Sequence, residues 1–127
     1  MKNNNPLSPH IQIYKWHVSS LVSISHRISG VINYLFFVFL SIWILFSFLF
    51  IETYEIFFIF YNSILGKFFV TGIIWSFSFQ ILSEIRHLFW DFGYGFDLKI
   101  SKITGLVVIF GSLILTISIL LIGRQII

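Results

Sequence analysis

The sequence predicts an all-α integral membrane protein with three transmembrane helices behind an extended N-terminal segment. Of its 127 residues, 57% are hydrophobic and 10% are charged, whereas a typical soluble domain carries about 25% charged residues. Short charged segments separate three apolar stretches, each close to or longer than the roughly 20 residues that cross a bilayer core. This length suits one domain, so residues 1–127 form a single predicted membrane unit.

The N-terminal segment, residues 1–20, is predicted to lie at the membrane surface. It is polar and contains Pro6 and Pro9, with neither the short apolar stretch of a signal peptide nor an Arg-rich transit sequence. Because Pro9 disfavours the helical conformation at Ser8, residues 6–14 are expected to run extended. The missing leader favours synthesis inside a bacterium or an organelle.

The first transmembrane helix is predicted over residues 21–51. The stretch 28–51 contains no ionisable side chain apart from Tyr34, which is long enough to cross a bilayer core. Glu52 follows immediately and marks an aqueous boundary.

The second and third transmembrane helices are predicted over residues 62–90 and 103–124. Lys67 lies near the start of the second helix, where its long side chain can reach the headgroups. The aromatic stretch 55–61 is expected to form an interfacial connection, since aromatic residues favour that depth. Two glycines within 91–97 end the second helix.

Lysine and arginine residues predict the orientation, because they accumulate on the cytoplasmic or matrix side. Three lie in residues 1–27 and three in residues 86–102, whereas the first loop has only Lys67. The N-terminus and the 91–102 loop are therefore expected to face the cytoplasm or the matrix. Arg124 is the one charge that disagrees.

Two polar clusters interrupt the apolar pattern near the same predicted membrane face. Ser23 and Arg27 are four residues apart and project from one helical face, with His26 beside them. The second cluster forms a stripe with spacings of four, three and four residues: Gln80, Glu84, His87 and Asp91. Such a stripe is costly against lipid, so it should face a bundle or a cofactor pocket. Headgroup anchoring by Arg and His, and bonding of Ser to its own helix, remain the plainer alternatives.

Several function classes are excluded by what the sequence lacks. The net charge of +3 is scattered, so no basic stripe indicates nucleic-acid binding. The chain has no Cys, which excludes disulfides and thiolate ligation of a metal or an iron–sulfur cluster. No nucleophile elbow, phosphate-binding loop or His pair for a metal is visible. From the residues alone, the prediction is a membrane bundle with an interfacial polar pocket.

Three motifs stand out along the chain: SPHIQIY at 8–14, SISHRISG at 23–30 and RHLFWDFG at 86–93. In their order and spacing, they resemble the cytochrome b membrane subunit of succinate dehydrogenase, respiratory complex II, in its mitochondrial and alphaproteobacterial branch. The resemblance implies a second small membrane-anchor subunit, which completes a heterodimeric helical bundle, and soluble iron–sulfur and flavoprotein subunits. It also implies the mitochondrial inner membrane, or alternatively a bacterial cytoplasmic membrane.

The resemblance assigns roles to individual residues. Ser23 and Arg27 match residues that line the ubiquinone pocket, and Trp16 matches a residue near it. His26, together with Arg27, matches the side of a haem propionate. His10 and Tyr14 are expected to reach the iron–sulfur subunit. A quinone carbonyl needs hydrogen-bond donors, and its reduction to the quinol needs nearby proton carriers.

The sequence departs from this family at the haem. Counting six residues back from Arg86, where the family has a haem-ligating His, gives Gln80. The family's Gly four residues after that ligand is Glu84 here. Gln is a poor haem ligand, and Glu adds bulk and charge where a flat ring should fit. Haem b is therefore expected to be absent or abnormally bound, with Glu84 neutral or paired with His87 or Arg86.

The predicted function is a complex II membrane anchor with a quinone-reduction site, not catalytic by itself. One alternative is a small transport or assembly subunit whose polar stripe lines a path through the membrane. Another is a degenerate anchor that no longer reduces quinone, against which Ser23 and Arg27 argue.

Overall fold

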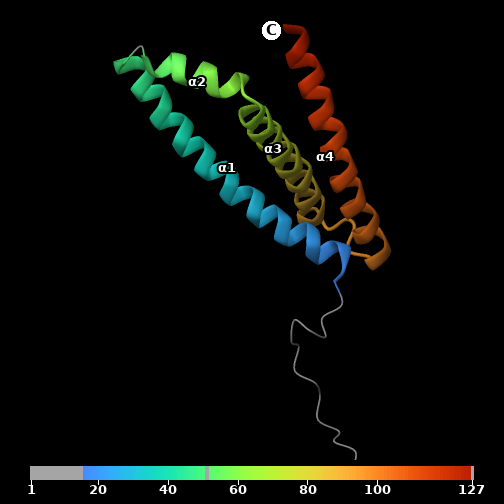
Figure 1. Ribbon diagram of the computed structural model, residues 1–127. Helices are drawn as coiled ribbons and strands as arrows, with labels where there is room; N and C mark the ends of the chain where they lie inside the picture. The colour runs from blue at the N-terminus through green and yellow to red at the C-terminus, as the bar shows by residue number, and fades with distance from the viewer. Residues whose placement is uncertain (1–15, 51, 127) are drawn as a thin grey trace, which may run out of the picture.

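The computed structural model describes residues 16–50 and 52–126, which fold into four helices and contain no strand (Figure 1). The helices are α1 (Val18–Leu49), α2 (Glu52–Asn62), α3 (Ile64–Asp91) and α4 (Leu98–Ile126). Three of them are long and apolar enough to cross a membrane, namely α1, α3 and the Leu98–Arg124 part of α4. The prediction of an all-α membrane fold with three long apolar helices is confirmed.

The predicted extended conformation of residues 6–14 lies outside the described residues, as does most of the predicted 1–20 surface segment. The structure describes this segment from Trp16 onward. His17 is the N-cap of α1, and its carbonyl accepts a hydrogen bond from the Leu21 N–H at 3.1 Å.

The helices begin and end at different residues from those that the apolar runs predicted. The helix α1 covers 18–49 rather than 21–51, and α4 covers 98–126 rather than 103–124. Polar residues can form the first turn of a helix at the membrane boundary, so the apolar run alone predicts the start of the helix too late in the chain. The predicted 55–61 connection is part of the eleven-residue helix α2.

At the turn between α2 and α3, the backbones of the two helices lie close together. Ser63 caps α3, and its hydroxyl accepts a hydrogen bond from the Gly66 N–H at 3.0 Å. A Cβ added at Gly66 would overlap the backbone carbonyl of Phe60. Glycine is therefore required where α3 leaves α2.

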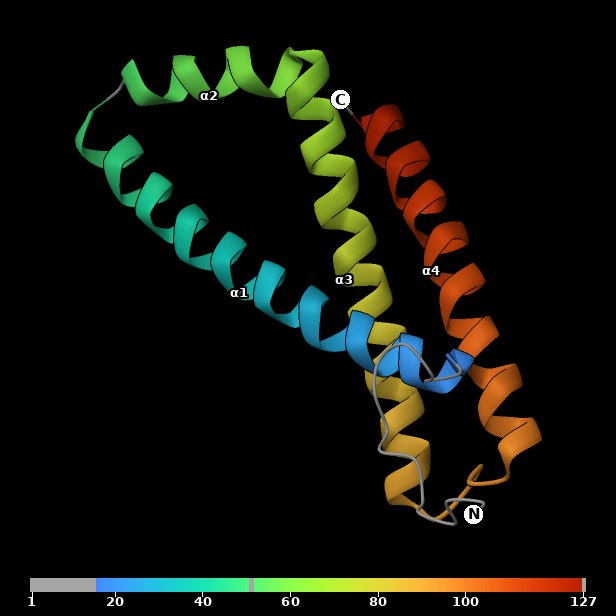
Figure 2. The same cartoon turned by 60° about the horizontal axis from the view of Figure 1, so that its bottom comes forward.

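The three long helices are packed together at one end and separate toward the other. In Figures 1 and 2, α1 and α3 cross near the N-terminal part of α1 and diverge toward α2, which bridges the open end, while α4 runs beside α3. The buried cluster Val22, Phe79 and Val108 comes from α1, α3 and α4. The packed core therefore lies at the same end as the polar residues.

The chain reverses between α3 and α4 through two glycines with left-handed backbone. Gly93 has φ of 84° and Gly95 has φ of 87°, a conformation that glycine adopts without a steric cost. The reversal returns Ser101 to the last turns of α3, where its hydroxyl meets the Arg86 side chain at 3.1 Å.

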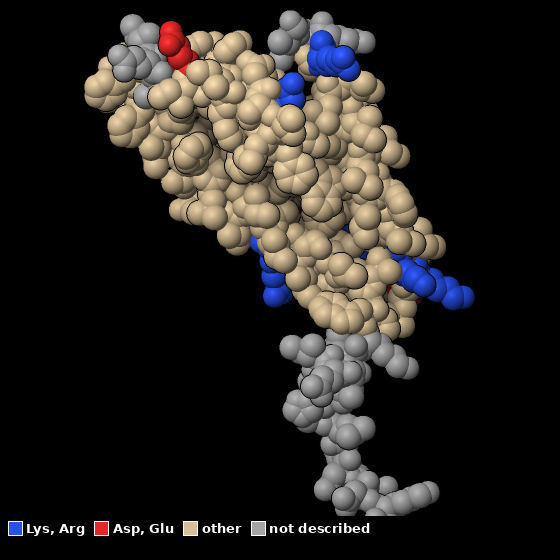
Figure 3. All heavy atoms as spheres, in the orientation of Figure 1, with Lys and Arg blue, Asp and Glu red and all other residues tan. Residues whose placement is uncertain are grey.

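Charged side chains gather at the two ends of the molecule. On the face drawn in Figure 3, Lys and Arg lie near both ends, acidic atoms are seen mainly at the upper end, and an uncharged band lies between the two ends. This distribution fits a chain whose long helices cross the hydrocarbon core of a bilayer.

Candidate functional site

A polar network joins α1 to α3 where the two helices cross. The His26 Nε2 atom lies 2.8 Å from the Gln80 Nε2 atom and 2.9 Å from the Glu84 Oε1 atom. The Ser29 hydroxyl donates to the Gln80 Oε1 atom at 2.7 Å. Three side chains of the two predicted polar clusters, namely His26, Gln80 and Glu84, thus form one continuous hydrogen-bonded group with Ser29.

The backbone of α1 comes close to α3 at this network. The Ser76 hydroxyl donates to the Ser29 carbonyl at 3.3 Å. A Cβ at Gly30 would lie 3.6 Å from the Gln80 Nε2 atom. The side chain of Gln80 therefore fills the space between the helices.

His26 and Glu84 form the only ion pair that is found among residues 16–50 and 52–126. The side chain of His26 is 19% exposed and that of Glu84 is 60% exposed. The sequence predicted that Glu84 would be neutral or paired, with His87 or Arg86 as the partner; the structure pairs it with His26 instead. The pairing partner is on α1, because the crossing of the helices brings His26 over the stripe of α3.

His87 lies beside the network, and no hydrogen bond of its side chain is found in the described part of the chain. Its ring centroid lies 5.2 Å from that of His26 and 5.2 Å from that of Trp90. Asp91, the last residue of α3, is exposed. Of the predicted stripe, Gln80 and Glu84 belong to the network, His87 packs beside it, and Asp91 lies beyond it.

Arg86 points to the other side of α3, toward α4 and the start of α1. It is 5% exposed. Its Nε atom donates to the Thr104 hydroxyl at 3.1 Å, and its Nη2 atom donates to the Ser101 carbonyl and hydroxyl, each at 3.1 Å. Its guanidinium carbon lies 4.1 Å from the centre of the Trp90 ring. This second polar group holds three helices together.

The predicted quinone-site residues lie along the start of α1. Ser23 is half-buried and Arg27 is exposed, one helical turn apart on one face. Trp16 precedes the helix and is 59% exposed. Within the described residues Glu84 pairs with His26, and Arg27 has no salt bridge.

Two contributors were missed by the sequence analysis. Ser29 lies three residues after His26, so its place on the same face could have been inferred from helical spacing. Ser101 gave no such signal, because its role depends on the return of α4 against α3.

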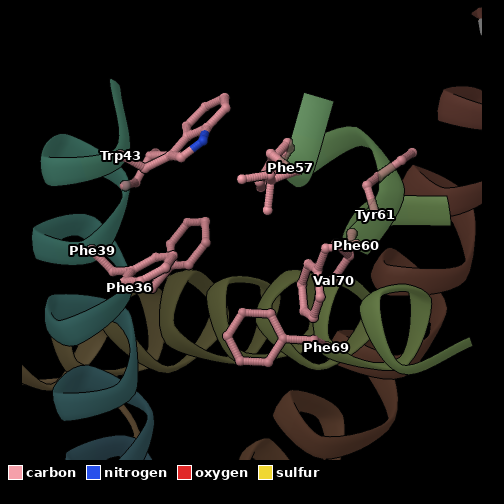
Figure 4. Close-up of a pocket in the computed structure, with 10 residues that line it drawn as sticks. Phe36, Phe39, Trp43, Phe57, Phe60, Tyr61, Phe69 and Val70 are labelled. Atoms are coloured by element: carbon pink, nitrogen blue, oxygen red, sulfur yellow. The ribbon is translucent and has the colours of Figure 1, made fainter. Parts of the chain in front are cut away.

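A cavity of about 530 Å³ lies between α1, α2 and α3, at the end away from the polar network (Figure 4). Its lining is aromatic and aliphatic, including Trp43, Phe57 and Phe69. Trp43 stacks on Phe57 with ring centroids 4.2 Å apart, and its buried Nε1 atom has no hydrogen-bond partner among the described residues.

A second cavity, of about 360 Å³, lies between α1 and α3 and is lined by Ser25, Ser29 and Ser76 among larger apolar side chains. Ser25 is two residues from both Ser23 and Arg27, which is about 200° around the helix. This cavity is therefore on the opposite flank of α1 from the Ser23–Arg27 face. Among the residues that the structure describes, no group of three or more His, Cys, Asp and Glu could hold a metal ion.

Comparison with known proteins gives one consistent result. The family model described as "Succinate dehydrogenase/Fumarate reductase transmembrane subunit" matches residues 1–119. The succinate dehydrogenase cytochrome b556 subunit of Rickettsia felis is 37% identical over 115 residues, covering 90% of this chain and 89% of that protein. That of Rickettsia prowazekii is 40% identical over 121 residues, covering 90% and 89%. The succinate dehydrogenase cytochrome b560 subunit of Marchantia polymorpha is 36% identical over 122 residues, covering 87% and 84%.

Proposed function

This chain belongs to the succinate dehydrogenase/fumarate reductase transmembrane subunit family, and we propose that it is the complex II anchor that helps form the ubiquinone-reduction site. It is a multi-pass protein of a mitochondrial inner membrane or a bacterial cytoplasmic membrane, as its three long apolar helices and its mitochondrial and bacterial relatives indicate. The N-terminus and the 92–97 turn face the matrix or the cytoplasm.

The partners are a second small anchor subunit, an iron–sulfur subunit and a flavoprotein subunit. Electrons from succinate pass through the flavin and the iron–sulfur centres of those partners to ubiquinone. The present chain has no Cys, so all iron–sulfur ligation must come from the partner. Its own contribution is a membrane position and polar side chains for the quinone.

Ser23 and Arg27 bind the quinone head, with Trp16 beside it. The observation that carries this proposal is that a hydroxyl and a guanidinium lie one helical turn apart at the membrane end of α1, where Arg27 is exposed and forms no salt bridge within the described residues. A donor that is not neutralised can hydrogen-bond a quinone carbonyl, and that bond strengthens as negative charge develops on the oxygen.

Haem b is absent or abnormally bound, because the residues at its family position do not fit it. The Gln80 amide contacts Ser29 and His26 at 2.7 and 2.8 Å, and it is not an imidazole. Glu84 brings a carboxylate into the same region, 2.9 Å from the His26 Nε2 atom. His26 is engaged by both, and His87 lies almost two helical turns from Gln80, about 10 Å along the axis.

Affinity purification of the tagged chain from its native membrane tests the proposal. The expected result is co-purification of a flavin-containing dehydrogenase that transfers electrons from succinate to ubiquinone. In cells that lack this chain, succinate oxidation with an artificial acceptor should be found only in the soluble fraction. A tagged chain that purifies without flavin and iron–sulfur subunits would contradict the proposal.

A further inference from the structure

Three polar atoms at the α1–α3 crossing lie within hydrogen-bond distance of one another. The His26 Nε2 atom is 2.8 Å from Gln80 Nε2 and 2.9 Å from Glu84 Oε1, and the Gln80 and Glu84 atoms are 3.4 Å apart. A ring nitrogen of a neutral His is either a donor or an acceptor, and an ionised carboxylate is only an acceptor. The triangle therefore restricts where protons can be.

Both possible arrangements place one proton in the His26–Glu84 contact. If His26 Nε2 carries the proton, it donates to the Glu84 carboxylate, and the Gln80 amide turns its oxygen toward the ring. Which end of an amide is oxygen and which is nitrogen is assigned from the hydrogen bonds around it. If Nε2 carries none, Glu84 must be protonated and donate, since two lone pairs at 2.9 Å would repel. In either case the proton can pass between a carboxyl group and an imidazole.

The network is open at one end and closed at the other. Glu84 is 60% exposed, His26 is 19% exposed, and Ser29, which holds Gln80 in place, is buried. A proton can therefore enter at Glu84 and move inward to His26, while Ser29 and Gln80 keep the ring in position.

Other charged groups around His26 are few. On α3, the His87 ring lies 5.2 Å away, Arg86 is turned toward Ser101 and Thr104, and Asp91 is exposed at the helix end. On its own helix, His26 adjoins Arg27 and lies three residues after Ser23. On α4, the basic residues Lys99 and Lys102 are exposed, and they have no contact with His26 in the described part of the chain. Glu84 is thus the carboxylate in contact with the ring.

We propose that the His26–Glu84 contact is the proton-supply site for quinone reduction, an inference that rests on the proposed function. Ubiquinone takes two electrons from the iron–sulfur subunit and two protons, and its two carbonyl groups become hydroxyl groups. The His26–Glu84 pair gives one proton to the quinone held by Ser23 and Arg27, Glu84 takes a proton from the aqueous phase, and the pair then gives the quinone its second proton. Glu84 thus serves proton transfer, and Gln80 positions the His26 ring, in the region where the family places a haem ligand.

The test uses glutamine substitutions in the intact complex. Glu84→Gln and His26→Gln keep hydrogen-bonding capacity but cannot carry the proton. Each is expected to lower succinate–ubiquinone reductase activity by roughly 100-fold, and the double variant should be no slower than the worse single variant, because the two residues act as one unit. Succinate oxidation with an artificial acceptor should be unchanged. Glu55→Gln, the same change on the exposed face of α2, is the matched control and should leave both activities unchanged.

A conservative variant separates proton supply from packing. Glu84→Asp keeps a carboxyl group, so it should recover most of the rate with a shifted pH–rate profile. The inference is overturned if Glu84→Gln keeps the wild-type rate at every pH, or if Glu84→Asp is as slow as Glu84→Gln. If the Glu84→Gln complex does not assemble, a Glu84→Asp complex with the wild-type pH–rate profile overturns the inference. A wild-type complex that reduces no quinone would instead refute the proposed function.

Discussion

His26 of α1 contacts two polar side chains of α3 at the crossing of these helices. Its Nε2 atom contacts Gln80 and Glu84, and its ring packs 5.2 Å from that of His87. Polar groups inside a membrane protein must find partners within the protein. With the Ser29 hydroxyl, which donates to Gln80, these contacts give hydrogen-bond partners to four side chains of two helices, whereas His87 only packs beside them.

Arg86 is expected to contribute to stability rather than to quinone chemistry. Arg86→Ala should destabilise the fold by about 3 kcal/mol, because hydrogen bonds from a charged donor to Thr104 and Ser101 are lost. The stability of Arg86→Lys should lie between that of the wild type and that of Arg86→Ala, since an ammonium cannot reproduce the planar guanidinium or its stacking on Trp90. Thermal denaturation of the purified complex measures the effect.

Arg124→Ala, in the exposed last turn of α4, is the control for Arg86 and should melt like the wild type. An Arg86→Ala complex with an unchanged melting temperature would show that the buried group is dispensable.

For the polar network at the α1–α3 crossing, the sequence predicted most of the residues involved but not which of them contact one another. The four-residue spacing of Gln80 and Glu84 correctly predicted a shared face. For a paired Glu84 the sequence offered His87 or Arg86, whereas the partner is His26, because the rotation of α3 against α1 depends on packing around Val22 and Phe79. Helical spacing within one segment carries no information about that rotation. The roles of Ser23, Arg27 and Trp16 stay predictions.

Among the elements, the α2–α3 junction is the tightest backbone contact. Gly66→Ala is expected to destabilise the fold by about 1–3 kcal/mol, because the added methyl group would overlap the Phe60 carbonyl and force the helices apart. Gly72→Ala is the matched control within α3, since a Cβ there meets no atom within 4 Å. The comparison of their melting temperatures tests the junction, and equal values for the two variants would contradict it.

The segment before α1 is expected to bind the soluble part of the complex. Removal of residues 1–14 should release the iron–sulfur and flavoprotein subunits from the membrane, because the proposed topology puts this segment and those subunits on the same side. Sedimentation of membranes followed by succinate oxidation with an artificial acceptor measures the release. Full retention of the dehydrogenase on the membrane would refute this role.

The apolar runs predicted three spans but not the helical character of residues 55–61. A short aromatic segment between two spans has the same composition whether it is extended or helical. The helix α2 follows from its tertiary setting, in which Phe57 packs on Trp43 of α1 and Ser63 caps the next helix.

For the whole molecule, the haem content of the purified complex is a direct prediction. Pyridine haemochrome analysis should find no stoichiometric six-coordinate haem b, because Gln80 and Glu84 occupy the family's ligand region with a hydrogen-bonded network. One haem b per complex with two strong axial ligands would contradict this prediction and require a ligand from the partner subunit.

Family membership was predictable from the sequence because three motifs keep their order over nearly the whole chain, and the match over residues 1–119 confirms it. The assembly was not predictable in detail. The α1 and α3 helices diverge toward α2 (Figure 1), and many apolar side chains on them are exposed in the single chain. We expect lipid and the proposed second anchor subunit to cover them.

The most direct test of the account compares two activities of the intact complex that carries Ser23→Ala or Arg27→Ala. The account predicts that succinate–ubiquinone reductase activity falls sharply in both variants, while succinate oxidation with an artificial acceptor stays at the wild-type level. The ratio of the two rates therefore isolates the quinone site from assembly. Wild-type ratios in both variants would contradict the claim that this end of α1 binds the quinone.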